Sequence, residues 1–295
     1  MKTAELYQSV TDTVIKQLEE GVPPWVRPWK DERRKGVGMI PSNLLTGRLY
    51  SGGNILLLWL TAQSREYPSM QFCTYNQVNT IGAQVRKGEK ATHVIFTKHV
   101  MRKDEETGDE KPGAVVKLYP VFNVSQLDKV PEQYLVPQEQ ESTPIADFRI
   151  KSFAGATGIK VSFGSAKAAY YPARDEIVMP NVGMFESPEA FTGTLMHEKI
   201  HGTSHKNRLN RQLGKRFGDE AYSFEEIIAE LGSAFLCARF GIEPSFRSAS
   251  YIQSWLKVLK GDNRAILSAA SYAGQASDWL WNKVYHQDER REAAE

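Results

Sequence analysis

The chain has 295 residues, which is long enough for two domains of ordinary size. Hydrophobic residues make up 41% and charged residues 24%, which is typical of folded globular proteins and excludes disorder over most of the chain. The longest apolar run, residues 55–60, is far shorter than the roughly 20 residues that a membrane-spanning helix needs. The start is polar and there are only two cysteines, so we expect a cytoplasmic protein with no disulfides and no membrane partner.

The net charge is only +2, but the basic residues are concentrated near the start of the chain. Residues 1–103 carry nearly twice as many Lys and Arg as Asp and Glu, whereas residues 151–295 are almost neutral. Between them, residues 104–110 hold five acids and no base. A basic segment of this kind either binds a polyanion or carries ordinary solubility charge, and charge alone does not separate the two.

The first half of the chain begins with a predicted helix. Its apolar residues recur every four positions and are Leu6, Val10, Val14 and Leu18. Gly21 and two prolines end this helix, and a basic stretch with two tryptophans follows at residues 23–36. A short apolar helix is predicted after Gly53 as far as Trp59, where the tryptophan belongs to the core.

The next predicted helix follows Thr74 and has three apolar residues on one side, Val78, Ile81 and Val85. Residues 91–101 and 114–124 are rich in β-branched and aromatic residues, and a charged turn at residues 104–113 joins them. This pattern is typical of a β-hairpin.

A stretch rich in Pro, Gln and Glu at residues 131–147 is predicted to be a linker between two domains. The domains are then 1–130 and 148–286, with a polar tail at 287–295. The second domain opens with strand-like pieces at 158–164 and 168–180. Helices follow near residues 188–204, 224–240, 249–260 and 263–285. The fold class predicted by this order is α+β.

The most specific motif is H-E-x-x-H at residues 197–201, inside a predicted helix. Residues four apart on a helix face the same way, so His197 and His201 could bind one zinc ion. Glu198 lies one step round the helix, which is where a general base for water belongs. The competing interpretation is two histidines on an ordinary amphipathic helix.

A catalytic zinc needs a third protein ligand. His205 is a candidate if Gly202 breaks the helix. Glu226 and Glu230 are candidates on the next helix, where one could bind the metal while the other holds a ligand histidine through its free ring nitrogen. Glu226 has a competing role, because Ser223 followed by Glu226 fits a capping box.

These residues resemble the zincin metallopeptidases, in which H-E-x-x-H is followed by a helix bearing E-x-x-A-[D/N/E]. Residues 226–230 fit the second motif, which favours Glu226 as the ligand. The whole chain is similar to the ArdC-like antirestriction proteins of conjugative plasmids. The cues include LYQSVTDTVIKQLEEGVPPWVRPW, SNLLTGRLYSGGN and QVRKGEKATHVIF in the first half and HEKIHGTSHKNRLNR and FGDEAYSFEEIIAELGSAFLCARFGI in the second.

The resemblance implies an N-terminal domain that binds single-stranded DNA, a zinc metallopeptidase domain and protection of incoming plasmid DNA from host restriction. Its partners would then be DNA, preferably single-stranded, and a protein substrate on DNA or a restriction enzyme. An alternative is a DNA-binding shield whose metal site is structural or regulatory. A nuclease fits less well, because nucleases often use two metals in carboxylate-rich sites.

Contacts to DNA are predicted in two basic clusters. Their members are Arg27, Lys30, Arg33, Arg34 and Lys35, and then Arg86, Lys87 and Lys90. Single strands are usually held by such cations together with aromatic platforms for the bases. Trp25, Trp29 and Tyr50 are the aromatic candidates, with core packing as the competing role. Lys199, within the H-E-x-x-H motif, is expected to point outward.

Overall fold

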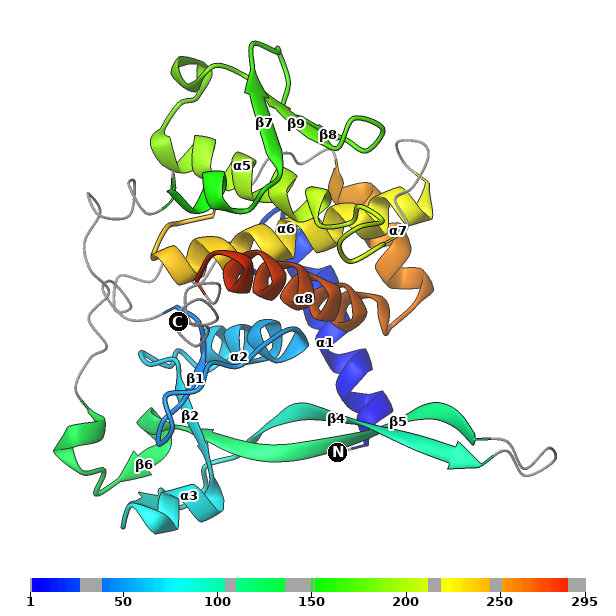
Figure 1. Ribbon diagram of the computed structural model, residues 1–295. Coiled ribbons are helices and arrows are strands. Elements are labelled where there is room, and N and C mark those ends of the chain that lie inside the picture. Colours follow the sequence, from blue (N-terminus) through cyan, green and yellow to red (C-terminus); the bar gives the residue numbers. More distant parts are fainter. Residues whose placement is uncertain are drawn as a thin grey trace, which may run out of the picture.

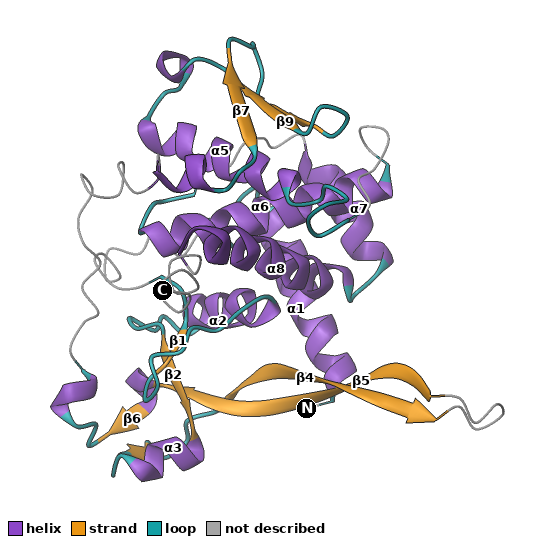
Figure 2. Cartoon of the chain, viewed as in Figure 1, coloured by secondary structure: helices purple, strands orange, loops and turns teal. Residues whose placement is uncertain are grey.

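The computed structural model describes residues 2–26, 39–103, 110–135, 150, 152–211, 219–244 and 251–285. It confirms the α+β class. Figure 1 shows long helices between a small sheet at the top and a long two-stranded ribbon at the bottom, and Figure 2 shows the same layers by secondary structure. No helix of the described residues is long and apolar enough to cross a membrane.

Among the described residues of the first half there are three α-helices: α1 (Thr3–Glu19), α2 (Gly53–Ser64) and the short α3 (Tyr75–Thr80). The four apolar residues that predicted α1 are all buried along it, as expected. The predicted helix after Thr74 forms with Thr74 as its N-cap, but it ends at Thr80. Gly82, with a φ of 72°, turns the chain there, so that Val85 lies in a strand and not on the helix.

The strands of the first half are β1 (Ser42–Asn43), β2 (Gln71–Thr74), β3 (Gln84–Val85), β4 (Thr92–Lys103), β5 (Glu110–Asn123) and β6 (Leu127–Asp128). They form a four-stranded sheet in the order β1-β2-β5-β4 and a separate pair, β3-β6. All of β4 pairs antiparallel with residues 110–121 of β5, which confirms the predicted hairpin.

The second half has a three-stranded sheet of β7 (Lys160–Phe163), β8 (Ala169–Tyr171) and β9 (Glu176–Met179), in the order β7-β9-β8. Four helices follow: α5 (Pro188–Gly202), α6 (Glu220–Phe240), α7 (Ile252–Gly261) and α8 (Ala265–Tyr285). Ser187 caps α5 with Pro188 at its first position, and Gly241 ends α6 in the left-handed conformation. All four helices lie close to their predicted positions.

The two halves share one hydrophobic core. Trp25 is buried against Trp255 of α7, with ring centroids 5.8 Å apart, and Trp59 of α2 packs on Phe235 of α6. Where α2 meets α8, the backbones are in direct contact: a Cβ placed on Gly274 would lie 2.6 Å from the Cα of Gly52. Trp59 is therefore a core residue, as predicted, and Trp25 is one too.

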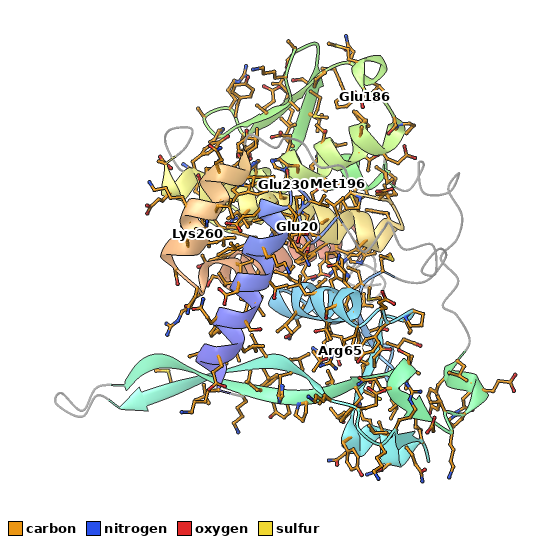
Figure 3. All side chains as sticks on the ribbon, turned by 180° about the vertical axis from the view of Figure 1, so that it is seen from behind. Glu20, Arg65, Glu186, Met196, Glu230 and Lys260 are labelled. Atoms are coloured by element: carbon orange, nitrogen blue, oxygen red, sulfur yellow. The ribbon has the colours of Figure 1, made fainter. Side chains whose placement is uncertain are left out.

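Figure 3, which views the molecule from behind, places Glu230 and Met196 near the middle of the molecule. Both are buried, Glu230 on α6 and Met196 on α5, where these two helices pack together. Helix α5 therefore lies between α6 on one side and strands β8 and β9 on the other, and polar side chains of α5 that face these neighbours are shielded from solvent.

A candidate metal centre

Two histidines of α5 meet on one face of the helix. His197 and His201 are four residues apart, and their Nε2 atoms lie 3.1 Å from each other. The helix is covered by α6 on one side and by β8 and β9 on the other, so neither imidazole is exposed to more than a small extent. Two imidazole nitrogens that converge in a buried place are suited to a shared cation.

Helix α6 brings a carboxylate to the same point. Glu226 lies 3.5 Å from His197 Nε2 through Oε2 and 3.4 Å from His201 Nε2 through Oε1. Each of these three residues can offer one ligand atom, and the three atoms lie within 4.8 Å of one another. The structure therefore brings together the three residues that the sequence predicted as metal ligands.

The predicted capping box at Ser223 and Glu226 is wrong. Helix α6 begins three residues before Ser223, and its N-cap is Asp219, whose side chain accepts a hydrogen bond from the backbone N–H of Tyr222. Ser223 is a buried residue inside the helix, so the Glu226 carboxylate has no capping role and is directed at the histidines.

Each histidine also has a carboxylate beside its other ring nitrogen. Glu230 lies 3.3 Å from His197 Nδ1, which matches the role considered for a second glutamate of α6. Glu225 lies 3.4 Å from His201 Nδ1. Carboxylates in this position fix the orientation of an imidazole and raise its basicity toward a metal.

The role of Glu225 was not predicted from the sequence. Its carboxylate accepts two hydrogen bonds from Arg211, at 3.1 and 2.7 Å. The same guanidinium donates to Thr203 Oγ1 and to the carbonyl of Ile200 at the end of α5. Arg211 belongs to a loop, so neither helical spacing nor a motif signals this contact.

The electrostatics of the cluster favour a cation. Burial alone would lower the pKa of His201, but Glu226, Glu225 and Glu198 outweigh it and raise this pKa to about 10. Burial raises the pKa of Glu226, yet His201 and His197 bring it far below its ordinary value. The negative charge that holds a proton on the imidazole would equally stabilise a divalent ion, so the residues present fit a metal of the zinc type.

Glu198 lies beside this cluster and not within it. Its Oε2 accepts a hydrogen bond of 2.8 Å from the backbone N–H of Tyr170 in β8. A cavity of about 260 Å³ opens between β8, α5 and α6. Its lining includes His197, Glu198, His201, Glu226, Tyr222 and Tyr251. A carboxylate, three potential ligands and a strand edge therefore face one space.

The loop after α5 ties β8 to this helix. Asp175, in the turn between β8 and β9, accepts hydrogen bonds from Tyr170 Oη and from the Arg208 guanidinium. Arg208 Nε also donates to the carbonyl of Gly202. His205, the weaker ligand candidate, follows the end of α5 and lies 3.9 Å from Asp175, outside the His197, His201 and Glu226 group.

Lys199 does not point outward as predicted, because it is fully buried. Its Nζ donates hydrogen bonds of 2.8 Å to the Ala154 carbonyl, to Thr157 Oγ1 and to the Ile159 carbonyl. Burial lowers its pKa to about 7. These hydrogen bonds join residues 154–159, which precede β7, to α5, the helix that carries the two histidines.

We expect Lys199→Met to lower the free energy of unfolding by about 3 kcal/mol. Three buried acceptors each lose a donor, although the Ala154 carbonyl keeps its hydrogen bond from Thr157 Oγ1. A buried acceptor left without a donor costs about 1–3 kcal/mol, part of which is offset because no amine has to be buried. Urea unfolding of the metal-free protein measures this difference. Lys206→Met, an exposed lysine in the next loop, serves as the control and should change stability little. Equal stability of the two variants would contradict the anchoring role.

Most of the predicted DNA contacts cannot be placed. Arg27, Lys30, Arg33, Arg34 and Lys35 lie outside the described residues, as does Trp29. Arg86 is engaged within the protein, since its guanidinium donates to the carbonyls of Ser125 and Leu127. Lys87 and Lys90 have exposed side chains, and Tyr50 is half-buried against Phe72.

Each half of the chain matches a known protein family. Residues 4–126 match the family model of the N-terminal domain of anti-restriction factor ArdC, and residues 148–272 match that of a zincin-like metallopeptidase. The metal-free crystal structure of ArdC from plasmid R388 superposes with a TM-score of 0.78 at 40% identity, covering 95% of this chain and 98% of that one. The chain belongs to the ArdC antirestriction family. The Mn(II)-bound ArdC structure gives a TM-score of 0.76 at 38% identity.

Two further relatives of this ArdC family member differ in length. An uncharacterized protein, y4eC, from Sinorhizobium fredii is 35% identical over 287 residues, which are 94% of this chain and 91% of y4eC. The DNA primase TraC of Escherichia coli is 34% identical over 294 residues, but the chain spans only 27% of its length. The ArdC-like unit thus also occurs as part of a larger protein associated with priming.

Proposed function

We propose that this protein is an antirestriction factor that binds single-stranded DNA, protects incoming plasmid DNA and carries a zinc-dependent metallopeptidase site. The observation that supports it most is the buried group of His197, His201 and Glu226 beside Glu198, in a chain whose two halves match the two parts of ArdC. The residues of the site support the metallopeptidase part of the proposal, and the family match supports the antirestriction part.

His197, His201 and Glu226 would hold the zinc ion, with Glu230 and Glu225 orienting the two imidazoles. A bound zinc supplies Lewis acidity and makes a water molecule acidic near neutral pH. Glu198 would take the proton of the attacking water and return it to the leaving amine, as general base and then general acid. The Tyr170 N–H holds the Glu198 carboxylate in place for both steps.

A peptide substrate would lie along β8. In the described part of the chain this strand pairs with β9 on one side only, and its other edge faces the cavity that Glu198 lines. An extended peptide can add to such an edge through main-chain hydrogen bonds, which positions a scissile carbonyl with little dependence on sequence. The anchoring of Asp175 by Arg208 keeps this edge at a fixed distance from α5.

DNA binding by the full chain is tested by titrating single-stranded and duplex oligonucleotides across a range of salt. We expect tighter binding of the single strand and an affinity that falls linearly with salt on logarithmic axes, because each phosphate contact releases about 0.7 counterion from a single strand. Binding that is absent, or that does not change with salt, would contradict the proposal.

A second function is a shield that protects DNA without proteolysis, with a structural or regulatory metal site. The observation that favours it is that the histidines lie where hydrogen bonds already join two helices. Arg211 donates both to the Ile200 carbonyl at the end of α5 and to Glu225 of α6. Protection of a plasmid from restriction digestion should be compared between the unsubstituted protein and Glu198→Gln. Equal protection identifies the shield, whereas loss of protection by a folded, metal-bound variant identifies a role for proteolysis.

A further inference from the structure

The β4–β5 ribbon carries an open pair of aromatic rings. It runs along the bottom of the molecule, below α2 and one end of α1 (Figure 1), and contacts both helices. Phe96 of β4 and Tyr119 of β5 are exposed for 55% and 43% of their surfaces. Their ring centroids are 5.9 Å apart and the ring planes are nearly perpendicular, at 88°. An edge-to-face contact of this kind leaves ring faces open to a further planar group.

The strand register places both rings on one face of the ribbon. Phe96 is opposite Lys117 and Tyr119 is opposite Val94, and residues two apart on a strand share a face. Val94 is buried in the core, whereas Phe96, Lys117 and Tyr119 are exposed. On this face of the ribbon, Val94 is therefore buried, whereas the two aromatic side chains and the lysine are exposed to solvent.

The charge of the ribbon suits a polyanion. The two strands, residues 92–103 and 110–123, contain five Lys and Arg and one acid, Glu110, which is opposite Lys103 at the turn end of the ribbon, although acids and bases are almost balanced over the whole chain. Aromatic side chains beside cations on a β-ribbon are the chemistry that holds single-stranded nucleic acid, since each base has a π-face to stack and each nucleotide a phosphate to neutralise.

We propose that Phe96 and Tyr119 form a stacking platform for the bases of single-stranded DNA, with Lys117 beside it to contact phosphate. This inference rests on the single-strand binding proposed above and assigns it a site. It replaces Trp25 and Tyr50 as stacking residues, because Trp25 is buried against Trp255 and Tyr50 is half-buried against Phe72. Duplex DNA keeps its bases stacked inside, so the platform also accounts for a preference for single strands.

The test uses the full chain with Phe96→Leu and Tyr119→Leu combined. Leucine keeps an apolar side chain on the ribbon but has no ring to stack. Tyr272→Leu is the matched control, because Tyr272 of α8 is also 43% exposed and packs on another ring, that of Phe224. Fluorescence anisotropy is measured with two labelled probes: an oligo(dT) strand and an abasic strand of the same length and charge.

We expect the double variant to bind oligo(dT) about tenfold more weakly for each ring lost. Its affinity for the abasic strand, and the salt dependence of both, should match those of the unsubstituted protein. Lys117→Ala should instead reduce the salt slope by about 0.7 on both probes. Thermal unfolding checks that the variants remain folded, and the Tyr272→Leu control should bind both probes normally.

Two results would overturn the platform while single-strand binding itself stands. One is unchanged binding of oligo(dT) by the double variant, and the other is an equal loss on both probes, which would place the contact on the backbone. Failure of the unsubstituted protein to bind oligo(dT) at any salt would instead refute the proposed single-strand binding. The experiment therefore separates an error in the site from an error in the function.

Discussion

Replacing Glu198 by glutamine should lower the rate of peptide cleavage at least a hundredfold while zinc binding stays nearly unchanged. A positioned acid–base group contributes roughly 10²–10⁴ in rate, and glutamine has no carboxylate to accept the proton of water. The amide oxygen can still accept the hydrogen bond from the Tyr170 N–H, so the variant keeps the local geometry. Since Glu198 is not among the three grouped ligand residues, the metal loses no donor.

Cleavage is measured with unfolded casein, with and without single-stranded DNA, and bound zinc is measured on the same samples. Glu189→Gln makes the same chemical change at an exposed position in the first turn of α5 and should retain full activity. Cleavage by Glu198→Gln at the unsubstituted rate would remove Glu198 from the mechanism. A loss of zinc in parallel with the loss of rate would make it a ligand and not a base.

The metal centre could be predicted largely because its parts are local. His197 and His201 are four residues apart on one helix, as are Glu226 and Glu230 on the next, and helical geometry alone puts each pair on one face. The relation between the two helices came from the resemblance to zincins, which the family match confirms. The same resemblance favoured Glu226 over Glu230, and the packing of α6 on α5 adds that Glu226 lies beside both Nε2 atoms while Glu230 lies beside His197 Nδ1.

Contacts between distant segments could not be predicted in the same way. The Arg211 contact to Glu225 joins a loop to a helix, and the pairing of Trp25 with Trp255 joins the two ends of the chain. The prediction that Lys199 points outward was wrong for the same reason. Three hydrogen-bond acceptors from a distant segment make burial of its amine possible, and the sequence around Lys199 does not show them. The spacing of apolar residues predicts a single helix or strand, whereas these contacts depend on how several helices, strands and loops pack together.

The aromatic residues of the first half illustrate the same point. Trp25 was a stacking candidate because cations follow it in the sequence, with core packing as the alternative, and Phe96 was not considered. In the structure, Trp25 is buried in the core shared by the two halves, while Phe96 is exposed on β4. Exposure, which decides whether a ring can stack on a base, depends on the tertiary arrangement and not on neighbouring charge.

The three glutamates of α6 that lie beside the histidines should differ in their effect on zinc affinity. Glu226→Ala removes a proposed ligand and should weaken binding by more than about a hundredfold, whereas Glu230→Gln and Glu225→Gln should weaken it about ten- to a hundredfold, as expected for groups that orient a ligand. Glu226 contacts both Nε2 atoms, while the other two carboxylates each lie beside one Nδ1. Calorimetric titration of the metal-free proteins with zinc measures this order.

Thermal unfolding provides a second readout of the same order. A metal at about 100 times its dissociation constant stabilises the folded state by about 2.7 kcal/mol, which raises the Tm of a chain of this size by roughly 4 °C. The rise should disappear in Glu226→Ala, be reduced in the other two variants and be complete in Glu220→Gln, an exposed position at the start of α6. If Glu230→Gln abolished zinc binding and Glu226→Ala did not, the ligand would be Glu230, and α6 would have to rotate on α5 to present it.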